Sequence, residues 1–219
     1  KKVKLPGADN RLFPQYYAPV IHYVDDKRII SPMRYSAYPP SYMSADQAKG
    51  LTTFNCRRDS LDKRFWSQAF GVHHGVVVIR GFYEWVAVRD LLKAGVVSLA
   101  QVEAKFSEMA AERKARILSQ GKKYKPTPTE LKDPRLREII IEFLPQSGND
   151  LIVPVIFSSS SDGTDWGFAI LTDEPHAEIA AAGHDRMPIS LTAEAMAGWL
   201  QPEKFSKDQL KALIDQKQL

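Results

Sequence analysis

The chain has 219 residues, 44% of them hydrophobic and 26% charged, which is the composition of a soluble globular protein with one hydrophobic core. Its single cysteine, Cys56, excludes a disulfide framework within the chain. No stretch approaches the length of a membrane span and no signal-peptide pattern opens the sequence, so we expect a cytoplasmic protein without membrane contact. Thirty Lys and Arg against 26 Asp and Glu give a net charge of +4, which permits a polyanionic partner without requiring one.

The first part of the chain is predicted to be rich in strands. Residues 19–38 alternate, turn at Asp25-Asp26 and alternate again, which indicates a β-hairpin. The segment LTTFNCRRDS opens as a short strand ending near Asn55, and DKRFWSQAF has the spacing of a helix. The segment GVVVIRGFYEW then has the apolar, β-branched character of one buried strand.

Helices are predicted in the middle and at the end of the chain. Residues 86–120 are rich in Ala, Glu, Lys and Leu, which favours a helix that stops at Gly121, and a basic, Pro-rich loop follows. LREIIIEFLP and DLIVPVIFSSS are expected to pair through the turn QSGN, and WGFAILT is a further buried strand. A short helix then runs into a loop, Thr192 caps the next helix, and an amphipathic helix ends the chain.

This order of elements has neither βαβ alternation nor an internal repeat. It predicts an α+β fold, a compact single domain over residues 1–219 with a largely antiparallel, β-barrel-like core, peripheral helices and a helical insertion at about 86–134. The sequence contains no GxGxxG, P-loop or CxxC motif, so we expect neither a nucleotide nor another cofactor. His73 and His74 would point to opposite faces of a strand, and we expect no metal there.

Three polar residues beside apolar segments could carry chemistry: Asn55, Glu84 and His184. Each has a structural alternative. Asn55 could cap a turn, Glu84 could pair with a nearby arginine, and His184 could end a helix after Gly183. Together, however, an amide, a tunable acid and an imidazole are what proton transfer at a carbonyl needs. Burial beside the apolar run would raise the pKa of Glu84.

Arginines accumulate around these positions. Arg57 and Arg64 follow Asn55, and Arg186 lies two residues beyond His184. Forked guanidinium groups suit phosphates, and aromatic side chains such as Trp85 offer faces on which bases stack. The alternatives are a solvated surface for the arginines and core packing for the aromatic side chains.

The motifs FNCRRDS, GFYEW and GHDRMPISL, in this order, resemble those of the SRAP domain family of abasic-site-processing proteins, once called SOS response-associated peptidases. The most specific matches are Gly81–Trp85 and His184–Pro188. The family's Asn-Ala-Arg-x-Glu is looser here, where it reads NCRRD from Asn55. Ala18-Pro19 resembles the family's Asn-x-Ala-Pro segment, with Tyr16 in place of the Asn. The resemblance covers most of residues 15–90 and 135–200.

The resemblance implies a compact α+β domain with a β-barrel-like core that binds single-stranded DNA and captures abasic sites. In the family, an N-terminal cysteine attacks the ring-opened sugar aldehyde, forming first a Schiff base and then a thiazolidine crosslink. It implies that Asn55 orients the N-terminal residue, that Glu84 is the acid and base of ring opening, and that His184 assists Schiff-base steps. The implied DNA contacts are those of Arg57, Arg64, Arg186, Trp85 and Pro19.

The sequence departs from the family in further places, among them MRYSAYPPSY, which replaces the family's Trp-Gly stretch after the hairpin. The family begins Met-Cys-Gly, whereas this sequence begins Lys1-Lys2-Val3, so we expect a preceding stretch that carries the nucleophile. Cys56 stands where the family has a small apolar residue and is expected to be inert packing. The insertion ends in KARILSQGKKYKP, whose basic character could extend DNA contact, meet another partner or face solvent.

Three functions are therefore open at this point. The first is an abasic-site crosslinking enzyme acting on single-stranded DNA. The second is a cysteine-dependent peptidase that cleaves its own leader. The third is a non-catalytic single-stranded DNA-binding module.

Overall fold

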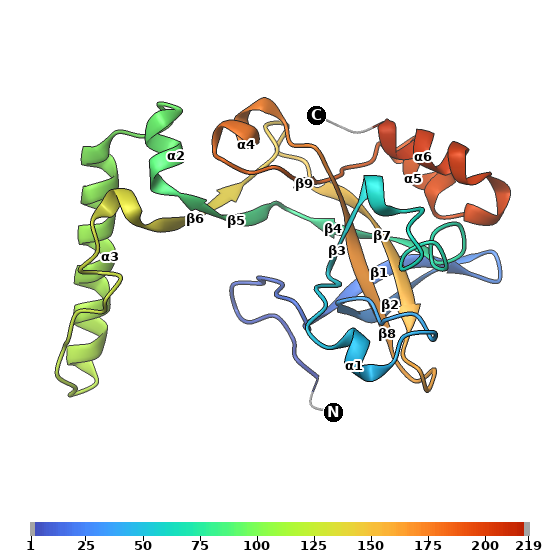
Figure 1. The fold of residues 1–219 in the computed structure, drawn as a ribbon, viewed down its shortest axis with the longest axis horizontal. Coiled ribbons are helices and arrows are strands. Elements are labelled where there is room, and N and C mark those ends of the chain that lie inside the picture. Colours follow the sequence, from blue (N-terminus) through green and yellow to red (C-terminus); the bar gives the residue numbers. More distant parts are fainter. Residues whose placement is uncertain (1–2, 217–219) are drawn as a thin grey trace. The chain divides into compact units, whose positions relative to one another are not determined.

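The computed structural model describes residues 3–216, which divide into two compact units (Figure 1). Unit 1 comprises the chain up to Gly81, Leu144–Asp173 and the chain from Pro188 onward. Unit 2 comprises Phe82–Phe143 and Glu174–Met187. The α+β class is confirmed.

Unit 1 is built on a β-barrel. The sheet runs in the order β2-β1-β4-β7-β8-β3, and an additional pairing of β2 with β8 closes five of these strands into a barrel. Most pairings are antiparallel, while β2–β8 and β3–β8 are parallel. The strands are β1 (Tyr17–Val24), β2 (Lys27–Tyr35), β3 (Asn55–Arg57), β4 (His74–Ile79), β7 (Leu151–Ser159) and β8 (Trp166–Asp173). The predicted barrel-like core is therefore confirmed.

The β1–β2 hairpin forms as the alternation predicted. Val24 pairs with Lys27, and the two turn residues Asp25 and Asp26 have φ angles of 48° and 59°. Two consecutive left-handed residues make the two-residue turn whose twist matches that of the flanking strands, and Asp tolerates this conformation better than most residues.

Short helices complete unit 1. They are α1 (Ala45–Ala48), α5 (Ala193–Trp199), α6 (Lys207–Asp215) and the 3₁₀ turns η1 (Arg58–Ser60) and η3 (Pro202–Lys204). The side-chain hydroxyl of Thr192 accepts a hydrogen bond from the Ala195 N–H, as the sequence predicted for the start of α5. The predicted helix over DKRFWSQAF is wrong, because residues 61–72 form a succession of turns.

Trp199 is fully buried where α5 packs on the barrel. Its indole Nε1 donates to the carbonyl oxygen of Gly75 at 2.9 Å, and its ring stacks on His74 with 3.8 Å between centroids. Gly75 has no room for a side chain, since a Cβ there would lie 2.7 Å from Cγ1 of Val20. The close approach of β4 to β1 therefore requires glycine.

Unit 2 holds a two-stranded sheet and three helices. β5 (Phe82–Ala87) pairs antiparallel with β6 (Glu138–Phe143). The helices are α2 (Val88–Lys93), α3 (Leu99–Ser119) and α4 (Ala177–Ala181), with a 3₁₀ turn η2 at Pro134–Leu136. β9 (Met187–Pro188) spans the sequence boundary between the units. The single helix predicted over 86–120 is in fact two, α2 and α3, and Gly121 follows the end of α3 with a φ of 70°, as predicted.

Two strand predictions are wrong. GVVVIRGFYEW is not one strand. The strand is interrupted at Arg80-Gly81, and the two parts, β4 and β5, belong to different sheets. LREIIIEFLP does not pair with DLIVPVIFSSS, because β6 pairs with β5 whereas β7 pairs with β4 and β8. The burial patterns agree with this: β6 alternates between exposed and half-buried residues, whereas β7 is buried along most of its length.

Candidate active site

Glu84 is the third residue of β5, where it pairs across the sheet with Ile141. The sequence predicted that Glu84 lies at the end of the apolar strand. In the structure, that strand is β4, which ends at Ile79, before Arg80-Gly81. Alternation along β5 places Glu84 on the same face as Val86, which is buried. The Glu84 side chain is 34% exposed, so its carboxylate keeps only part of its hydration.

His184 lies just beyond the C-terminal end of α4, after Ala182 and Gly183, and this helix end fixes its position. Gly183 has a φ of 90°, its N–H donates to the Ala180 carbonyl at 2.9 Å, and the His184 N–H donates to the Ile179 carbonyl at 3.2 Å. This is the glycine-terminated helix end that the structural alternative predicted. It also presents the imidazole to β5, so the two interpretations of His184 describe one arrangement.

The imidazole of His184 bridges two groups of β5. Its Nε2 lies 2.7 Å from the Trp85 carbonyl oxygen, and its Nδ1 lies 3.6 Å from Oε2 of Glu84. A carbonyl oxygen can only accept, so Nε2 carries a hydrogen and donates it. In the neutral imidazole, Nδ1 is then a lone pair directed toward the Glu84 carboxyl group.

The environment of Glu84 favours its protonated form. Burial raises the pKa of Glu84, the nearby charge of Asp185 raises it further, and His184 acts in the opposite direction. The raised pKa is what the sequence predicted. A carboxyl group whose pKa is raised, beside an oriented imidazole, is an arrangement that can deliver and take up protons.

Asn55 lies in unit 1, where β3 begins at this residue instead of ending near it. It pairs with Ile170 of β8, and its Oδ1 accepts a hydrogen bond of 3.0 Å from the Tyr35 hydroxyl. The Tyr35 ring is stacked on Phe168 with 5.3 Å between centroids. Sequence reasoning missed Tyr35, whose only local signal is its place in an alternating strand. That Asn55 meets Glu84 and His184 stays a prediction.

The three predicted phosphate-binding arginines have different surroundings. Arg57 Nη2 lies 2.9 Å from Oδ2 of Asp59, and both side chains are about half exposed. Arg186 Nη1 donates to the Asp185 carbonyl at 2.8 Å. The guanidinium carbon of Arg64 lies 4.1 Å from the centre of the Tyr42 ring, which holds its charge at the surface.

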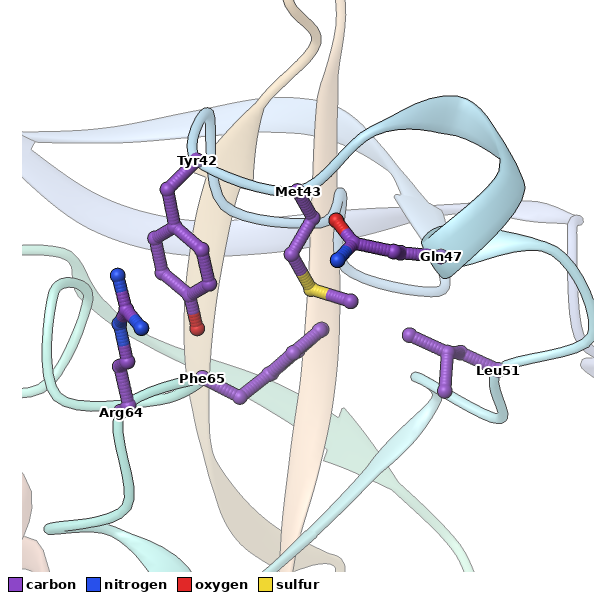
Figure 2. A pocket seen from close by; sticks show the side chains of 6 residues that line it. All are labelled: Tyr42, Met43, Gln47, Leu51, Arg64 and Phe65. Atoms are coloured by element: carbon purple, nitrogen blue, oxygen red, sulfur yellow. The ribbon is translucent and has the colours of Figure 1, made fainter.

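Arg64 borders an open surface pocket of about 440 Å³ in unit 1. Figure 2 shows its side chain beside Tyr42, with Met43 and Phe65 further along the wall. The wall is largely apolar, and Arg64 supplies its cationic edge. Aromatic rings next to a guanidinium group are suited to a base and its phosphate.

Two further predicted contacts lie at the surface. Trp85 is 62% exposed on the outer side of β5, where it pairs with Ile140. Pro19 is exposed in β1, opposite Pro32 of β2. Their side chains are therefore accessible, while their contact with DNA stays a prediction.

The Cys56 thiol is fully buried among core residues of unit 1. Burial raises the pKa of Cys56 well above its ordinary value, so the thiolate that reacts as a nucleophile is scarce. The Sγ hydrogen is directed at the Arg57 carbonyl oxygen, 3.6 Å away. Cys56 therefore packs in the core, in an environment that disfavours a nucleophilic thiolate.

His73 directly precedes β4, and His74 is its first residue. Both ring nitrogens of His74 are engaged by the backbone, Nδ1 at 3.0 Å from the Trp199 carbonyl oxygen and Nε2 at 2.9 Å from the Gly71 N–H. Within residues 3–216, no group of three or more His, Cys, Asp or Glu side chains could hold a metal. Over the same part of the chain, no helix combines the length and apolar character needed to cross a bilayer.

Comparison with known proteins places the chain in a family. A family model described as SOS response associated peptidase (SRAP) matches residues 6–219. The fold resembles that of a protein from Bacteroides thetaiotaomicron, with a TM-score of 0.59 at 16% identity over 91% of this chain and 68% of that one. It also resembles a phage-related protein from Bordetella bronchiseptica, with a TM-score of 0.60 at 14% identity over 95% of this chain and 76% of that one. A comparison with curated proteins gave no match.

At such identities the two solved structures show a likeness of fold alone. The family match is stronger evidence, because it extends over nearly the whole sequence and includes the motifs around Asn55, Glu84 and His184. It supports a function associated with DNA damage. The chain belongs to the SRAP (SOS response associated peptidase) family.

Proposed function

We propose that this protein binds single-stranded DNA and captures abasic sites as a covalent crosslink, with Glu84 and His184 moving the protons. The observation that carries the proposal is the 3.6 Å approach of His184 Nδ1 to Oε2 of a Glu84 whose pKa is raised. The proposed nucleophile is an N-terminal cysteine, as the family resemblance implies. The single cysteine of residues 1–219 is the internal, fully buried Cys56.

Glu84 would act first, on the closed sugar of the abasic site. Opening the ring requires a proton on the ring oxygen and removal of a proton from the C1′ hydroxyl. A protonated Glu84 can supply the first proton, and the carboxylate it becomes can accept the second. The product is the C1′ aldehyde, and the net reaction leaves Glu84 in its starting state.

His184 would serve the steps at the aldehyde. The cysteine amine adds to the C1′ carbon to give a carbinolamine, whose hydroxyl leaves as water and gives a Schiff base. The thiol then adds to the same carbon and closes the thiazolidine. An imidazole that returns a proton to the departing hydroxyl accelerates the loss of water. Asn55, with its amide held by Tyr35, would orient the N-terminal residue.

DNA binding would use the cations and aromatic groups already described. Arg57, Arg64 and Arg186 would hold phosphates, because a guanidinium group matches phosphate oxygens with two parallel hydrogen bonds. Trp85 and Pro19 would offer exposed apolar faces to the bases.

The test uses the full-length protein with its native start. The protein is mixed with a single-stranded oligonucleotide holding one abasic site and run on a denaturing gel. A band that survives denaturation is expected, with Glu84→Gln reducing its rate of formation by about 10²-fold, the range of general acid–base catalysis. Glu138→Gln is the matched control, because Glu138 is an exposed carboxylate of the same two-stranded sheet.

Absence of this band, with an N-terminal cysteine verified by mass spectrometry, would contradict the proposal. If intact and abasic oligonucleotides then bound equally, the protein would be a non-catalytic DNA-binding module. The peptidase alternative predicts release of a leader peptide. With Cys56 buried, such cleavage would also need the proposed N-terminal cysteine.

A further inference from the structure

Positive charge is concentrated in one short segment of unit 2, residues 113–132. It contains seven basic residues and one acidic residue, Glu130, a surplus of six, whereas the whole chain has a net charge of +4. The basic residues are Arg113, Lys114, Arg116, Lys122, Lys123, Lys125 and Lys132. All of them except Arg113 are exposed.

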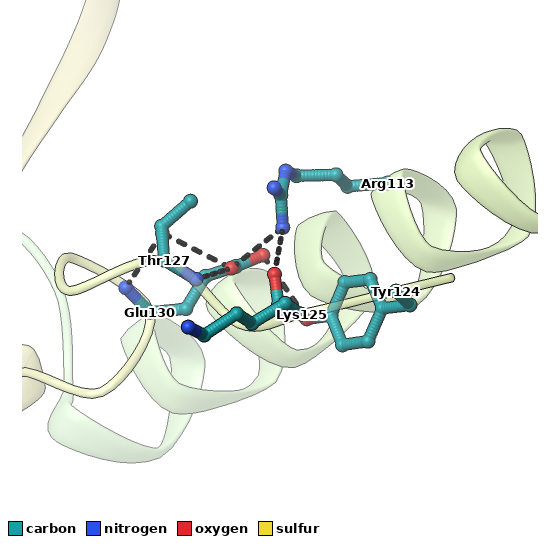
Figure 3. A network of polar contacts seen from close by, with 5 residues as sticks. All are labelled: Arg113, Tyr124, Lys125, Thr127 and Glu130. Atoms are coloured by element: carbon teal, nitrogen blue, oxygen red, sulfur yellow. Dashed lines mark hydrogen bonds and ion pairs between the residues drawn. The ribbon is translucent and has the colours of Figure 1, made fainter. Parts of the chain in front are cut away.

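These cations are held on a folded element. After α3 ends at Ser119, residues 122–132, which we call the strap, run back alongside the C-terminal turns of the helix (Figure 1). Figure 3 shows Arg113 of the helix and Thr127 of the strap converging on the Glu130 carboxylate. Arg113 Nη1 lies 2.8 Å from Oε2 of Glu130, and the Lys125 carbonyl accepts from the same Nη1 at 3.4 Å.

The only acidic residue of the segment, Glu130, links the strap to α3. The Thr127 N–H donates to Oε2 of Glu130 at 2.6 Å, and the Glu130 N–H donates to Oγ1 of Thr127 at 3.2 Å. This is the reciprocal pattern of a capping box. The bond from the Thr127 N–H holds the pKa of Glu130 below its ordinary value, so the carboxylate stays charged. Within residues 3–216, none of the other six cations forms an ion pair with a carboxylate.

Helix stability explains only part of this charge. A cation in the last turn of a helix interacts favourably with its dipole, which accounts for Arg116. Lys122, Lys123 and Lys125 lie beyond the helix and gain nothing from it. An ordinary solvated surface mixes both signs, as the first half of α3 does with Lys105 paired to Glu108 at 2.8 Å. A cluster of one sign weakens the fold by self-repulsion and favours an anionic partner.

We propose that the C-terminal half of α3 and the strap form a surface that binds the phosphate backbone of DNA, apart from the residues of the candidate active site. Lysines are compact point charges that suit phosphate oxygens, and Lys122, Lys123 and Lys125 follow one another along an extended segment, as phosphates do along a strand. The choice of DNA over an acidic protein rests on the proposed function. The charge surplus itself is an observation that is independent of the proposed function.

The experiment measures binding of the full chain to a fluorescently labelled, intact single-stranded oligonucleotide over a series of salt concentrations. The test variant is Lys122→Gln/Lys123→Gln/Lys125→Gln. Each phosphate contact contributes about 0.7 to the slope of log K against log salt for single strands, so the slope should become shallower by about 2. The control variant is Lys27→Gln/Lys93→Gln/Lys105→Gln, which removes the same charge from exposed sites elsewhere.

A second variant distinguishes binding by a fixed surface from binding by net charge alone. Glu130→Gln makes the protein more positive but releases the strap. A fixed surface predicts weaker binding, whereas net charge alone predicts tighter binding and would overturn the proposal. Equal slopes for the test and control triple variants would overturn it too. So would polyglutamate of equal charge binding more tightly than the oligonucleotide, which would assign the surface to an acidic protein.

The covalent band on abasic DNA is scored in parallel, at saturating DNA. The strap variants should retain it, since they leave Glu84 and His184 unchanged. If the test and control triple variants had equal salt slopes while the covalent band was retained, the strap proposal alone would be contradicted. Loss of the band in every variant, with the slope effect intact, would contradict the proposed function alone.

Discussion

The imidazole of His184 lies between two groups of one strand, with Nε2 at 2.7 Å from the Trp85 carbonyl oxygen and Nδ1 at 3.6 Å from the Glu84 carboxylate. The first contact fixes the orientation and tautomer of the ring, so the second atom has a defined role toward Glu84. The pairing of a raised-pKa acid with an oriented imidazole is therefore formed by β5 and the end of α4 alone.

The rate of crosslink formation should depend on pH through Glu84. Its pKa is raised, so the protonated acid persists to higher pH than in an ordinary glutamate, and a step that needs this acid should slow as the pH rises through that value. Rates of band formation measured under single-turnover conditions should show this limb in the wild type. A Glu84→Gln variant that kept the same limb would remove Glu84 from the role.

The same shift also predicts that the free energy of unfolding depends on pH. An acid whose pKa is raised by folding binds its proton more tightly in the folded state, so its contribution to stability is lost as pH rises from the ordinary value to the raised one. Glu84→Gln should therefore be slightly more stable than the wild type at neutral pH and show no gain at acid pH. Urea unfolding at both pH values checks this, with Glu138→Gln as the control.

Gly183 should be intolerant of any side chain. Its φ of 90° strains an L-residue, and a Cβ would lie 3.1 Å from Cβ and Oδ2 of Asp90. Gly183→Ala should cost about 2 kcal/mol or more and displace His184, which follows it. Gly95→Ala is the matched control, with a φ of 69° and nothing within 4 Å of its Cβ, and should cost about 1 kcal/mol. Equal losses of stability and of crosslinking in the two variants would refute the crowding argument.

What the sequence predicted well was local. The Asp25-Asp26 hairpin and the Thr192 cap depend on residues within one turn, and the pKa direction of Glu84 depends on apolar neighbours in its own segment. The strand predictions were wrong where the two paired strands are far apart in the sequence. β5 finds its partner β6 more than fifty residues later, and no pattern within either strand specifies that choice.

The candidate site shows the same division. Glu84 and His184 are about a hundred residues apart in the sequence, and only the family resemblance brought them together before the structure did. The hydrogen bond from Tyr35 to Asn55 was missed, since it depends on β2 and β3 both pairing with β8. The strap is a loop, as the sequence predicted, but its attachment to α3 was not predicted, because a reciprocal Thr127–Glu130 pair without a following helix has no strong sequence signal.

Cys56 should behave as an inert thiol. Because it is buried and its pKa is raised, a thiol reagent should modify it only at the rate of unfolding. Cys56→Ala should cost roughly 1 kcal/mol through the small cavity it leaves and should not change crosslinking. Mass spectrometry after a brief exposure to iodoacetamide checks the first statement, and the denaturing gel checks the second. Rapid labelling of the folded protein, or loss of the band in Cys56→Ala, would contradict it.

His74 should make unit 1 sensitive to acid. Burial lowers its pKa from 6.5 to about 3, so the neutral ring stabilises the folded state above pH 6.5, and this contribution is lost as the pH falls toward the lowered value. Between pH 6.5 and 4 the loss should approach roughly 3 kcal/mol in the free energy of unfolding. His74→Leu should be less stable at pH 7, since the Gly71 N–H loses its acceptor, yet should vary less with pH. Urea unfolding from pH 7 to 4 measures both quantities, with the partly exposed His176→Leu as the control. If His74→Leu lost as much stability on acidification as the wild type, another group would be responsible for the acid sensitivity.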